Sequence, residues 1–193
     1  FCYTYFLMKR EVARILHDTK YIDSSNKDQF GMGWGDWSDE TVPNTYVHYS
    51  DIAMETLLIK LHPLMELETK TKLYPTYSYT RLYKKGDVLH KHTDRASCIV
   101  STTLNLGGDP WPIFLKPPDE KEVSVLLEPG DMLIYDGVNY EHWREEFTGD
   151  HCGQVFLHYN EISKGDKYKY DERPFLGLPP AFRQCVLTET ANV

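Results

Sequence analysis

A short run rich in histidine and aspartate, joined by one histidine much later, carries the side chains best suited to chemistry. His92 and Asp94 are two residues apart, and His142 follows Asp94 by 48 residues. In an extended segment, residues i and i+2 point to the same side, so His92 and Asp94 can bind one metal ion while His142 arrives from a later strand. Two histidines and one carboxylate on one face of an octahedral ion are the ligand set of non-haem Fe(II) oxygenases. The spacing therefore predicts a metal site with three positions open to O2 and other ligands.

The same run permits a second ligand set. His90 and His92 form a His-x-His pair, and His142 follows a Pro-Gly-Asp turn, which resembles the pattern of cupin-type metal sites. In a site with three ligands and open positions, only one of Asp94 and His90 can join His92 and His142. Each histidine by itself also has a simpler explanation, as a surface residue beside a turn or as a buried residue bonded to a backbone carbonyl. The choice between Asp94 and His90 separates the two metal hypotheses.

Strands must bring these residues together, and the middle of the chain has the texture of short strands. Turn sequences such as Lys84-Lys85-Gly86-Asp87 and Glu128-Pro129-Gly130 separate runs rich in β-branched and aromatic residues. Six short strands without intervening helices favour an antiparallel jelly roll. The predicted strands are 76–83, 98–106, 112–116, 122–127, 131–135 and 154–159.

The predicted architecture is one domain, mainly β with flanking helices, in three parts. Residues 1–72 give helical support, residues 73–160 form the jelly-roll core, and residues 161–193 form an extended tail that wraps the outside. Helical spacing occurs twice in the first part. The first helix carries Leu7, Val12, Ile15 and Leu16, and the second is capped by Ser50 and has a face of Ile52, Leu57, Leu58, Leu61 and Leu64. Between them, the stretch 31–43 reads as a long surface loop, and its part 33–40 is a candidate lid.

Composition sets the class of protein. The chain has 193 residues and a net charge of −8, with 41% hydrophobic residues, enough for a sizeable core. An acidic surface repels phosphate backbones, which argues against nucleic-acid binding and against docking on an acidic membrane. The longest apolar runs are far shorter than the roughly 20 residues of a membrane span. The four cysteines form no CxxC pair, so we expect reduced thiols and a cytoplasmic location.

Two segments around the candidate ligands resemble a known family. The run Tyr79-Thr80-Arg81-Leu82-Tyr83-Lys84-Lys85-Gly86-Asp87-Val88-Leu89-His90-Lys91-His92-Thr93-Asp94 is similar to the entry to the catalytic core of prolyl 4-hydroxylase-like 2-oxoglutarate/Fe(II)-dependent dioxygenases. The run from Leu127 to Tyr135, followed by Glu141-His142-Trp143-Arg144, resembles the passage of that family to its distal histidine. The resemblance covers about residues 75–160 and implies a double-stranded β-helix fold.

The resemblance also implies a site and a reaction. His92, Asp94 and His142 become the iron ligands, and Tyr83 falls where the family has a tyrosine that contacts the 2-oxoglutarate carboxylate. The reaction is then iron-centred, without a separate acid or base. It hydroxylates a peptidyl (prolyl by analogy), amino-acid or small-molecule substrate with O2 and releases succinate and CO2, with L-ascorbate as a candidate reductant.

This chain departs from the family at one functional position. The family places an Arg or Lys about ten residues after the distal histidine, but residues 148–154 contain neither. A buried dicarboxylate needs a cationic partner, so another residue must supply the charge. Arg144 lies two residues after His142, Arg81 lies two before Tyr83, and Lys116 is a third candidate. We favour Arg144 because it lies beside a metal ligand.

Three further residues complete the predicted site. Tyr79 shares strand parity with Tyr83 and is a candidate for the pocket wall. Arg95 follows Asp94 directly and is a candidate to orient its carboxylate, and Trp143 adjoins His142. A jelly-roll interaction domain that has lost catalysis is the non-enzymatic alternative, supported by the missing basic residue after His142.

Overall fold

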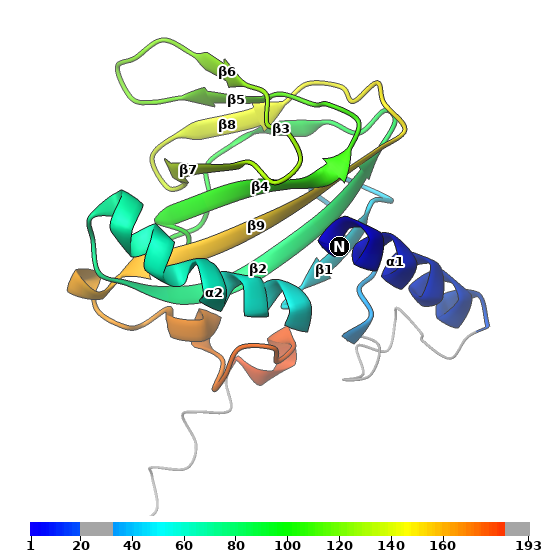
Figure 1. The fold of residues 1–193 in the computed structure, drawn as a ribbon, viewed down its shortest axis with the longest axis horizontal. Coiled ribbons are helices and arrows are strands. Elements are labelled where there is room, and N and C mark those ends of the chain that lie inside the picture. Colours follow the sequence, from blue (N-terminus) through cyan, green and yellow to red (C-terminus); the bar gives the residue numbers. More distant parts are fainter. Residues whose placement is uncertain (20–32, 184–193) are drawn as a thin grey trace, which may run out of the picture.

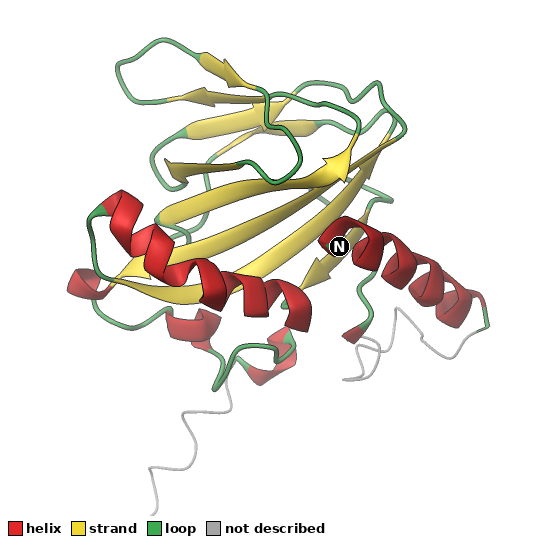
Figure 2. Cartoon of the chain, in the orientation of Figure 1, coloured by secondary structure: helices red, strands yellow, loops and turns green. Residues whose placement is uncertain are grey.

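The computed structural model describes residues 1–19 and 33–183, and within them two antiparallel sheets face each other (Figures 1 and 2). One sheet has the order β1 (Tyr46–Tyr49), β2 (Leu73–Lys84), β9 (His151–Glu161), β4 (Val100–Gly108) and β7 (Met132–Asp136). The smaller sheet has the order β3 (Leu89–His92), β8 (Glu141–Arg144), β5 (Ile113–Lys116) and β6 (Val123–Val125). Most neighbouring strands are far apart in sequence, as in a jelly roll, and β1–β2 and β5–β6 are the pairs of consecutive strands. The predicted fold class is confirmed.

The two faces of the large sheet have different partners because strand residues alternate sides. On β2, Leu82 packs in the same core cluster as helical residues Phe6, Met54 and Leu58. The next residue, Tyr83, belongs to a separate cluster with Trp111 on the other face, toward the small sheet. The helices thus cover one face of the large sheet, and the other face is left for the cavity.

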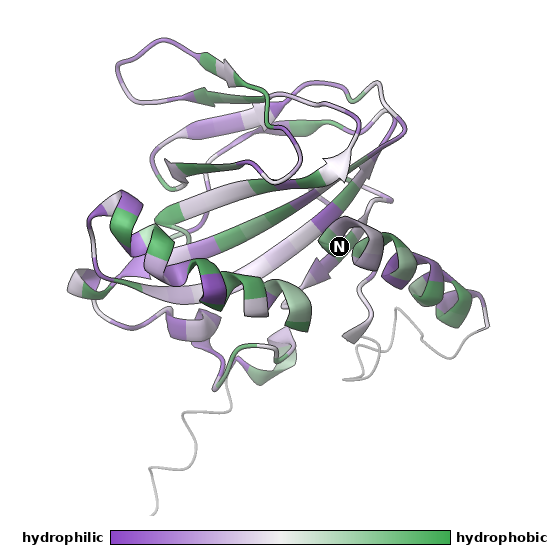
Figure 3. Cartoon of the chain, viewed as in Figure 1, coloured by the Kyte–Doolittle hydropathy of each residue, from purple (hydrophilic) through white to green (hydrophobic). Residues whose placement is uncertain are grey.

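Two helices form the covering layer: α1 (Cys2–Asp18) and α2 (Ile52–Thr69). Hydrophobic and hydrophilic stretches alternate along both ribbons (Figure 3). In both helices one face packs on the sheet, through Phe6 of α1 and Met54 and Leu58 of α2, while the outer face of α2 also carries exposed apolar residues such as Leu67. The N-terminal helix therefore packs on one sheet as predicted.

The predicted start and buried face of the second helix need correction. Asp51 caps α2, because its side chain accepts hydrogen bonds from the backbone N–H of Ala53 and Met54. Ser50 lies before the cap with a φ of 59°. The buried face holds Met54, Glu55, Leu58 and Met65, whereas Ile52 is 70% exposed. The helix continues through Pro63 to Thr69.

The boundaries of the predicted strands differ from those observed by a few residues, and three short strands were missed. β1, β3 and β8 have four residues each, too few for a clear alternation in sequence. β3 and β8 carry the two candidate histidine ligands. Among the residues that the structure describes, no helix has the length and apolar character of a membrane span.

The described part of the predicted tail, to residue 183, is a series of short 3-10 turns rather than an extended segment, and residues 184–193 lie outside the described residues. They are η2 (Ile162–Lys164), η3 (Lys169–Glu172) and η4 (Pro180–Phe182). Arg173 anchors them through a fully buried ion pair with Glu55 of α2, at 2.7 Å. This segment reaches the cavity, since Arg183 lines it.

Candidate metal centre

A register shift in β3 sets the geometry of the two histidines. β3 pairs with β8 so that Leu89 lies opposite Arg144 and His92 lies opposite His142, with a bulge between Leu89 and His92. Between these two pairs, two residues on β3 lie opposite one on β8, and the bulge changes which side chains point inward. Leu89 is buried and His92 half-buried, while His90 and Lys91 between them are exposed.

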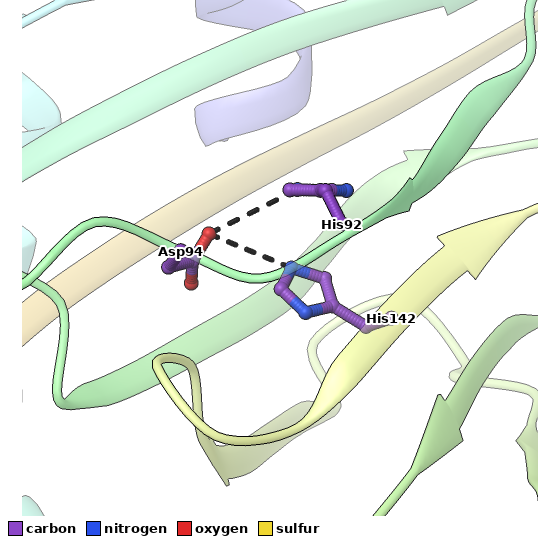
Figure 4. A group of neighbouring side chains, drawn as sticks. All are labelled: His92, Asp94 and His142. Atoms are coloured by element: carbon purple, nitrogen blue, oxygen red, sulfur yellow. Dashed lines mark ion pairs between the residues drawn. The ribbon is translucent and has the colours of Figure 1, made fainter.

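The three predicted ligands converge on one point (Figure 4). Asp94 Oδ1 lies 3.5 Å from His142 Nε2 and 3.9 Å from His92 Nε2. One ligand atom from each residue lies within 4.8 Å of the others. Within the described residues this is the one group of three or more potential ligands close enough to hold a metal, and His90 is not part of it.

Backbone carbonyls hold both rings in the required tautomer. His92 Nδ1 bonds the carbonyl of His90 at 2.7 Å, and His142 Nδ1 bonds the carbonyl of Tyr140 at 3.0 Å. A carbonyl only accepts, so each Nδ1 carries the proton and each Nε2 keeps its lone pair for a metal. Burial, reinforced by the nearby His142, also lowers the pKa of His92, which favours the neutral ring.

The carboxylate of Asp94 is fixed through its second oxygen. Ser101 donates to Asp94 Oδ2 at 2.6 Å and lies 3.0 Å from His158 Nδ1. Burial would raise the pKa of Asp94, but its contacts with His142, His158 and Ser101 outweigh burial and lower it to about 2. The carboxylate is therefore ionised at neutral pH and keeps Oδ1 toward the histidines.

Gly137 makes room for this arrangement. Its carbonyl accepts the backbone N–H of Asp94 at 2.7 Å. A Cβ at this position would lie 2.4 Å from Asp94 Oδ2 and 2.3 Å from Ser101 Oγ. Only glycine fits between the chain and the Asp94 carboxylate.

The donor set matches a divalent ion that takes nitrogen and oxygen ligands on one face. Two neutral imidazoles and one carboxylate are typical of Fe(II) centres with open positions. The ligand atoms of the histidines carry no competing hydrogen bond from backbone groups, since Nδ1 makes those bonds. The residues present therefore fit Fe(II).

A cavity of about 560 Å³ contains this group. The two sheets form its walls. The large sheet contributes Tyr77 and Tyr79 from β2, and the small sheet contributes Leu89 from β3 and His142 from β8. Residues of the 33–45 segment and Arg183 of the C-terminal segment also line it. The volume falls in the range of small-molecule sites, which is roughly 300–1,000 Å³.

Arg144 is a buried cation without an acidic partner. Its side chain has 1% exposure, and its guanidinium donates to the carbonyl of Trp111 at 2.5 Å and to Thr103 Oγ1 at 3.3 Å. No carboxylate of the described residues lies within ion-pair distance, and its buried Nε has no hydrogen-bond partner. Burial lowers the pKa of Arg144, yet a guanidinium stays charged at neutral pH. A buried unpaired charge of this kind calls for an anion.

Tyr83 and Gln154 lie beside this cation. Tyr83 is fully buried, and its ring packs edge-on against Trp111 at 4.7 Å. Gln154 bonds the Thr103 hydroxyl at 3.0 Å, and that hydroxyl also accepts from Arg144. Gln154 stands in the stretch where the family that the sequence resembles has its basic residue. Arg144, on β8, places its guanidinium against the Thr103 hydroxyl that Gln154 also contacts.

Arg81 already has an acid partner. It lines the cavity and pairs with Asp39 of the 33–45 segment, and it also donates to the Tyr83 hydroxyl at 3.2 Å. Tyr79 donates to the same Asp39 carboxylate at 2.5 Å. Asp39 thus links the segment that holds the candidate lid to two residues of β2, and all three residues line the cavity.

The remaining candidates lie farther from the metal ligands. Trp143 stacks on Phe114, with ring centres 5.6 Å apart, and Lys91 Nζ lies 3.8 Å from the centre of the Trp143 ring. Trp143 does not line the cavity. Lys116 is exposed at the end of β5. Arg95 lines the cavity but bonds Asp171, at 2.8 Å, rather than Asp94.

Sequence reasoning did not identify Ser101, His158 and Gly137 as parts of the site. Ser101 and His158 stand inside strands β4 and β9, where their parity puts them on the cavity face. Their alternation along the strands was the one signal in the sequence, and it identifies the cavity face only when the pairing of the strands is known. Gly137 follows β7 in a turn, and the close approach of Asp94 is the reason that this position requires glycine.

Known proteins share this fold at low sequence identity. No protein-family model and no curated protein matches the sequence. A 2OG-Fe(II) oxygenase family oxidoreductase from Burkholderia pseudomallei matches with a TM-score of 0.54 and 13% identity, over 60% of this chain and 66% of that one. AviO1 from Streptomyces viridochromogenes matches with a TM-score of 0.51 and 15% identity, over 81% and 84%.

A third structure with this fold is a prolyl hydroxylase from Trichoplax adhaerens, solved with a peptide fragment of hypoxia inducible factor. It matches with a TM-score of 0.51 and 14% identity, over 66% of this chain and 67% of that one. The chain thus spans about two thirds of the length of the Burkholderia and Trichoplax proteins. At these identities the likeness establishes the fold.

Proposed function

We propose that this protein is an Fe(II)- and 2-oxoglutarate-dependent dioxygenase that hydroxylates its substrate and releases succinate and CO2. The observation that carries the proposal is the convergence of His92, Asp94 and His142 inside a jelly roll, with both Nε2 lone pairs directed at the Asp94 carboxylate. The fold shared with the 2OG-Fe(II) oxygenase family oxidoreductase from Burkholderia supports it.

Arg144 supports 2-oxoglutarate as the co-substrate. A dicarboxylate that binds iron through one end needs a cation for its far carboxylate, and Arg144 is buried, charged and without an acid partner. Tyr83 lies beside it with a hydroxyl that can donate, while the Thr103 hydroxyl accepts from Arg144 and donates to Gln154. We therefore assign Arg144, with Tyr83, to the far carboxylate, and leave Arg81 paired with Asp39.

The chain's own contribution is position, charge and exclusion of water. Iron and 2-oxoglutarate, when bound, supply the oxidising chemistry. His92, Asp94 and His142 would hold the metal on one face, and Ser101 keeps the Asp94 carboxylate in place. Tyr135 and Phe156 line the cavity with apolar surface, and the candidate lid covers it through Asp39.

The substrate is a peptidyl, amino-acid or small-molecule compound in this proposal. The peptide option draws on the Trichoplax prolyl hydroxylase, which was solved with a peptide fragment. The cavity volume of about 560 Å³ accommodates a small molecule or one peptide side chain with its neighbours.

An anaerobic absorption measurement tests the proposal. Purified protein is mixed with Fe(II) and 2-oxoglutarate without O2, and the weak visible charge-transfer band of the chelate is recorded for the wild type and for Asp94→Ala. We expect the band in the wild type and its loss in Asp94→Ala. His90→Ala is the matched control, because His90 lies outside the metal group, and it should keep the band.

Three results would contradict the proposal in different ways. Metal binding without any band would indicate a metal site that does not chelate 2-oxoglutarate. A band lost in His90→Ala and kept in Asp94→Ala would support the cupin-type ligand set. No metal binding at all would favour the non-catalytic interaction domain.

A further inference from the structure

One end of the cavity has two arginines that share a single acid. Arg95 Nη2 lies 2.8 Å from Asp171 Oδ2, and Arg183 bonds the same oxygen. The Tyr49 hydroxyl also donates to it, at 2.6 Å. The described residues offer no second acid within ion-pair distance of either guanidinium. Two positive charges against one negative charge leave one unit of positive charge at this end.

Tyrosine rings hold the two guanidinium groups in place. The rings of Tyr49 and Tyr77 are stacked with centroids 5.2 Å apart. Arg95 lies 4.5 Å above the centre of the Tyr77 ring, and Arg183 lies 4.8 Å from that of Tyr49. Stacking restricts the motion of a guanidinium while its edge keeps N–H donors for an oxyanion. The Nε of Arg183 is buried and has no partner.

This end is separate from the position assigned to the co-substrate. On the β3–β8 ladder, Arg144 lies opposite Leu89, three residues before His92, whereas Arg95 lies three residues after His92. Arg95 follows the end of β3 and lines the cavity with the metal ligands, whereas Arg144 is not among the residues that line it. Arg144 is fully buried, and the Arg95 side chain is 47% exposed. A ligand that enters from solvent meets Arg95 first.

Two of the other charged groups of the cavity have partners of their own. Asp39 pairs with Arg81, and Asp94 belongs to the metal group. Asp36 also lines the cavity and accepts hydrogen bonds from the backbone N–H and hydroxyl of Ser38, which carry no charge. Arg95 and Arg183 are the two cations of the lining that share one acid.

We infer that the substrate is a small organic acid whose oxyanion binds between Arg95 and Arg183, with its body extending toward the metal ligands. This inference rests on the proposed function and adds the class of substrate. The cavity lining places both arginines and the metal ligands around one space of about 560 Å³, so one small molecule can reach both.

Matched acids and amides test the inference. The anaerobic complex of wild-type protein with Fe(II) and 2-oxoglutarate is titrated with the twenty N-acetyl amino acids and with their primary amides, at constant ionic strength. Binding is followed by calorimetry and by the change in the visible band. We expect at least one acid to bind about tenfold more tightly than its own amide, because a charge-assisted bond to a guanidinium is lost in the amide.

The arginine variants locate the effect. In Arg95→Gln and in Arg183→Gln the ratio of acid to amide affinity should fall toward one, while Arg95→Lys should keep part of it. The amide is the internal reference, since a misfolded variant loses both ligands. Arg14→Gln is the matched control, because Arg14 is an exposed arginine on α1 that lines a different cavity.

The possible failures are distinguishable. If the wild type gives no visible band, the proposed function is wrong and the inference falls with it. If the band is present but no acid binds more tightly than its amide, the inference alone is wrong. The inference is also wrong if the preference for acids survives unchanged in both glutamine variants.

Discussion

At the residue scale, the candidate centre depends on which atom of each side chain has no other hydrogen bond and can bind a metal. The carbonyls of His90 and Tyr140 occupy Nδ1 of His92 and His142, and Ser101 occupies one oxygen of Asp94. Each ligand is therefore oriented by a bond made at its other end. Groups held in this way need little rearrangement when a metal binds.

Arg144 carries the first prediction at this scale. We expect Arg144→Gln to weaken 2-oxoglutarate binding by about a hundredfold, since the loss of a buried charge partner costs about 2–5 kcal/mol. Fe(II) binding alone should change little, because none of the three ligands is altered. The dissociation constant of 2-oxoglutarate is measured by anaerobic titration of the visible band, and that of Fe(II) by calorimetry.

Arg81→Gln is the comparison for this prediction. Arg81 has Asp39 as its partner, so its loss should affect 2-oxoglutarate binding less than the loss of Arg144. If Arg81→Gln abolishes 2-oxoglutarate binding and Arg144→Gln does not, Arg81 is the carboxylate partner and the assignment of Arg144 is wrong.

At the scale of elements, a bulge and a glycine turn bring the ligands together. The bulge in β3 aligns His92 with His142 and turns His90 outward. The turn after β7 brings the Gly137 carbonyl to the backbone N–H of Asp94. The strands thus position the two histidines, and the turn positions the aspartate.

Gly137→Ala tests this role of the turn. The added Cβ would lie well inside contact distance of Asp94 Oδ2 and Ser101 Oγ, and backbone and carboxylate must shift to admit it. We expect the affinity for Fe(II) to fall about tenfold or more, as for a lost orienting group. Calorimetric titration with Fe(II) under anaerobic conditions gives the value.

Gly33→Ala is the control for Gly137→Ala. A Cβ at Gly33 meets nothing within 4 Å, so this variant should bind Fe(II) like the wild type. Unchanged metal affinity in Gly137→Ala would mean that the turn does not determine the position of Asp94.

At the scale of the whole molecule, Asp51 joins the helical layer to the sheet. Its carboxylate is fully buried, caps α2, and accepts from Lys9 at 2.5 Å and Tyr5 at 2.9 Å, both on α1. Burial would raise the pKa of Asp51, but its contacts with His48 and Lys9 outweigh burial and lower it. The ionised carboxylate is therefore more stable in the folded protein than in the unfolded chain.

The pH dependence of stability follows from the sign of this shift. A lowered pKa stabilises the fold above the ordinary aspartate pKa of about 3.9, and this stabilisation is lost as the pH falls below it. We expect Asp51→Asn to lower the free energy of unfolding at pH 7 by about 3 kcal/mol, with a smaller difference from the wild type at about pH 3. Urea denaturation at both pH values measures it.

Asp166→Asn serves as the control for the Asp51 prediction. Asp166 is exposed in the C-terminal segment, and its substitution should change stability at neither pH. A difference between Asp51→Asn and wild type that is the same at both pH values would show that the ionised carboxylate of Asp51 does not stabilise the fold.

Local patterns in the sequence were sufficient to predict the fold class and to propose three residues that the structure brings together. Alternating residues and turn residues indicate the longer strands, because both patterns depend only on residues that are close together along the chain. The His-x-Asp pair and the later histidine have the right types, and their strand parity is a local property. The same parity made Arg144 a candidate for the cavity side of β8.

Only the tertiary structure decided which other residues join these ligands and which partners they contact. Whether His90 or Asp94 joins the group depends on a bulge defined by pairing with β8, and pairing is a contact between segments far apart in sequence. The roles of Ser101, His158 and Gly137, the pairing of Arg81 with Asp39, and the charge shared by Arg95 and Arg183 have the same origin. Each depends on distances between side chains from different elements, and a spacing along the chain carries no information on those distances until the strands have their register.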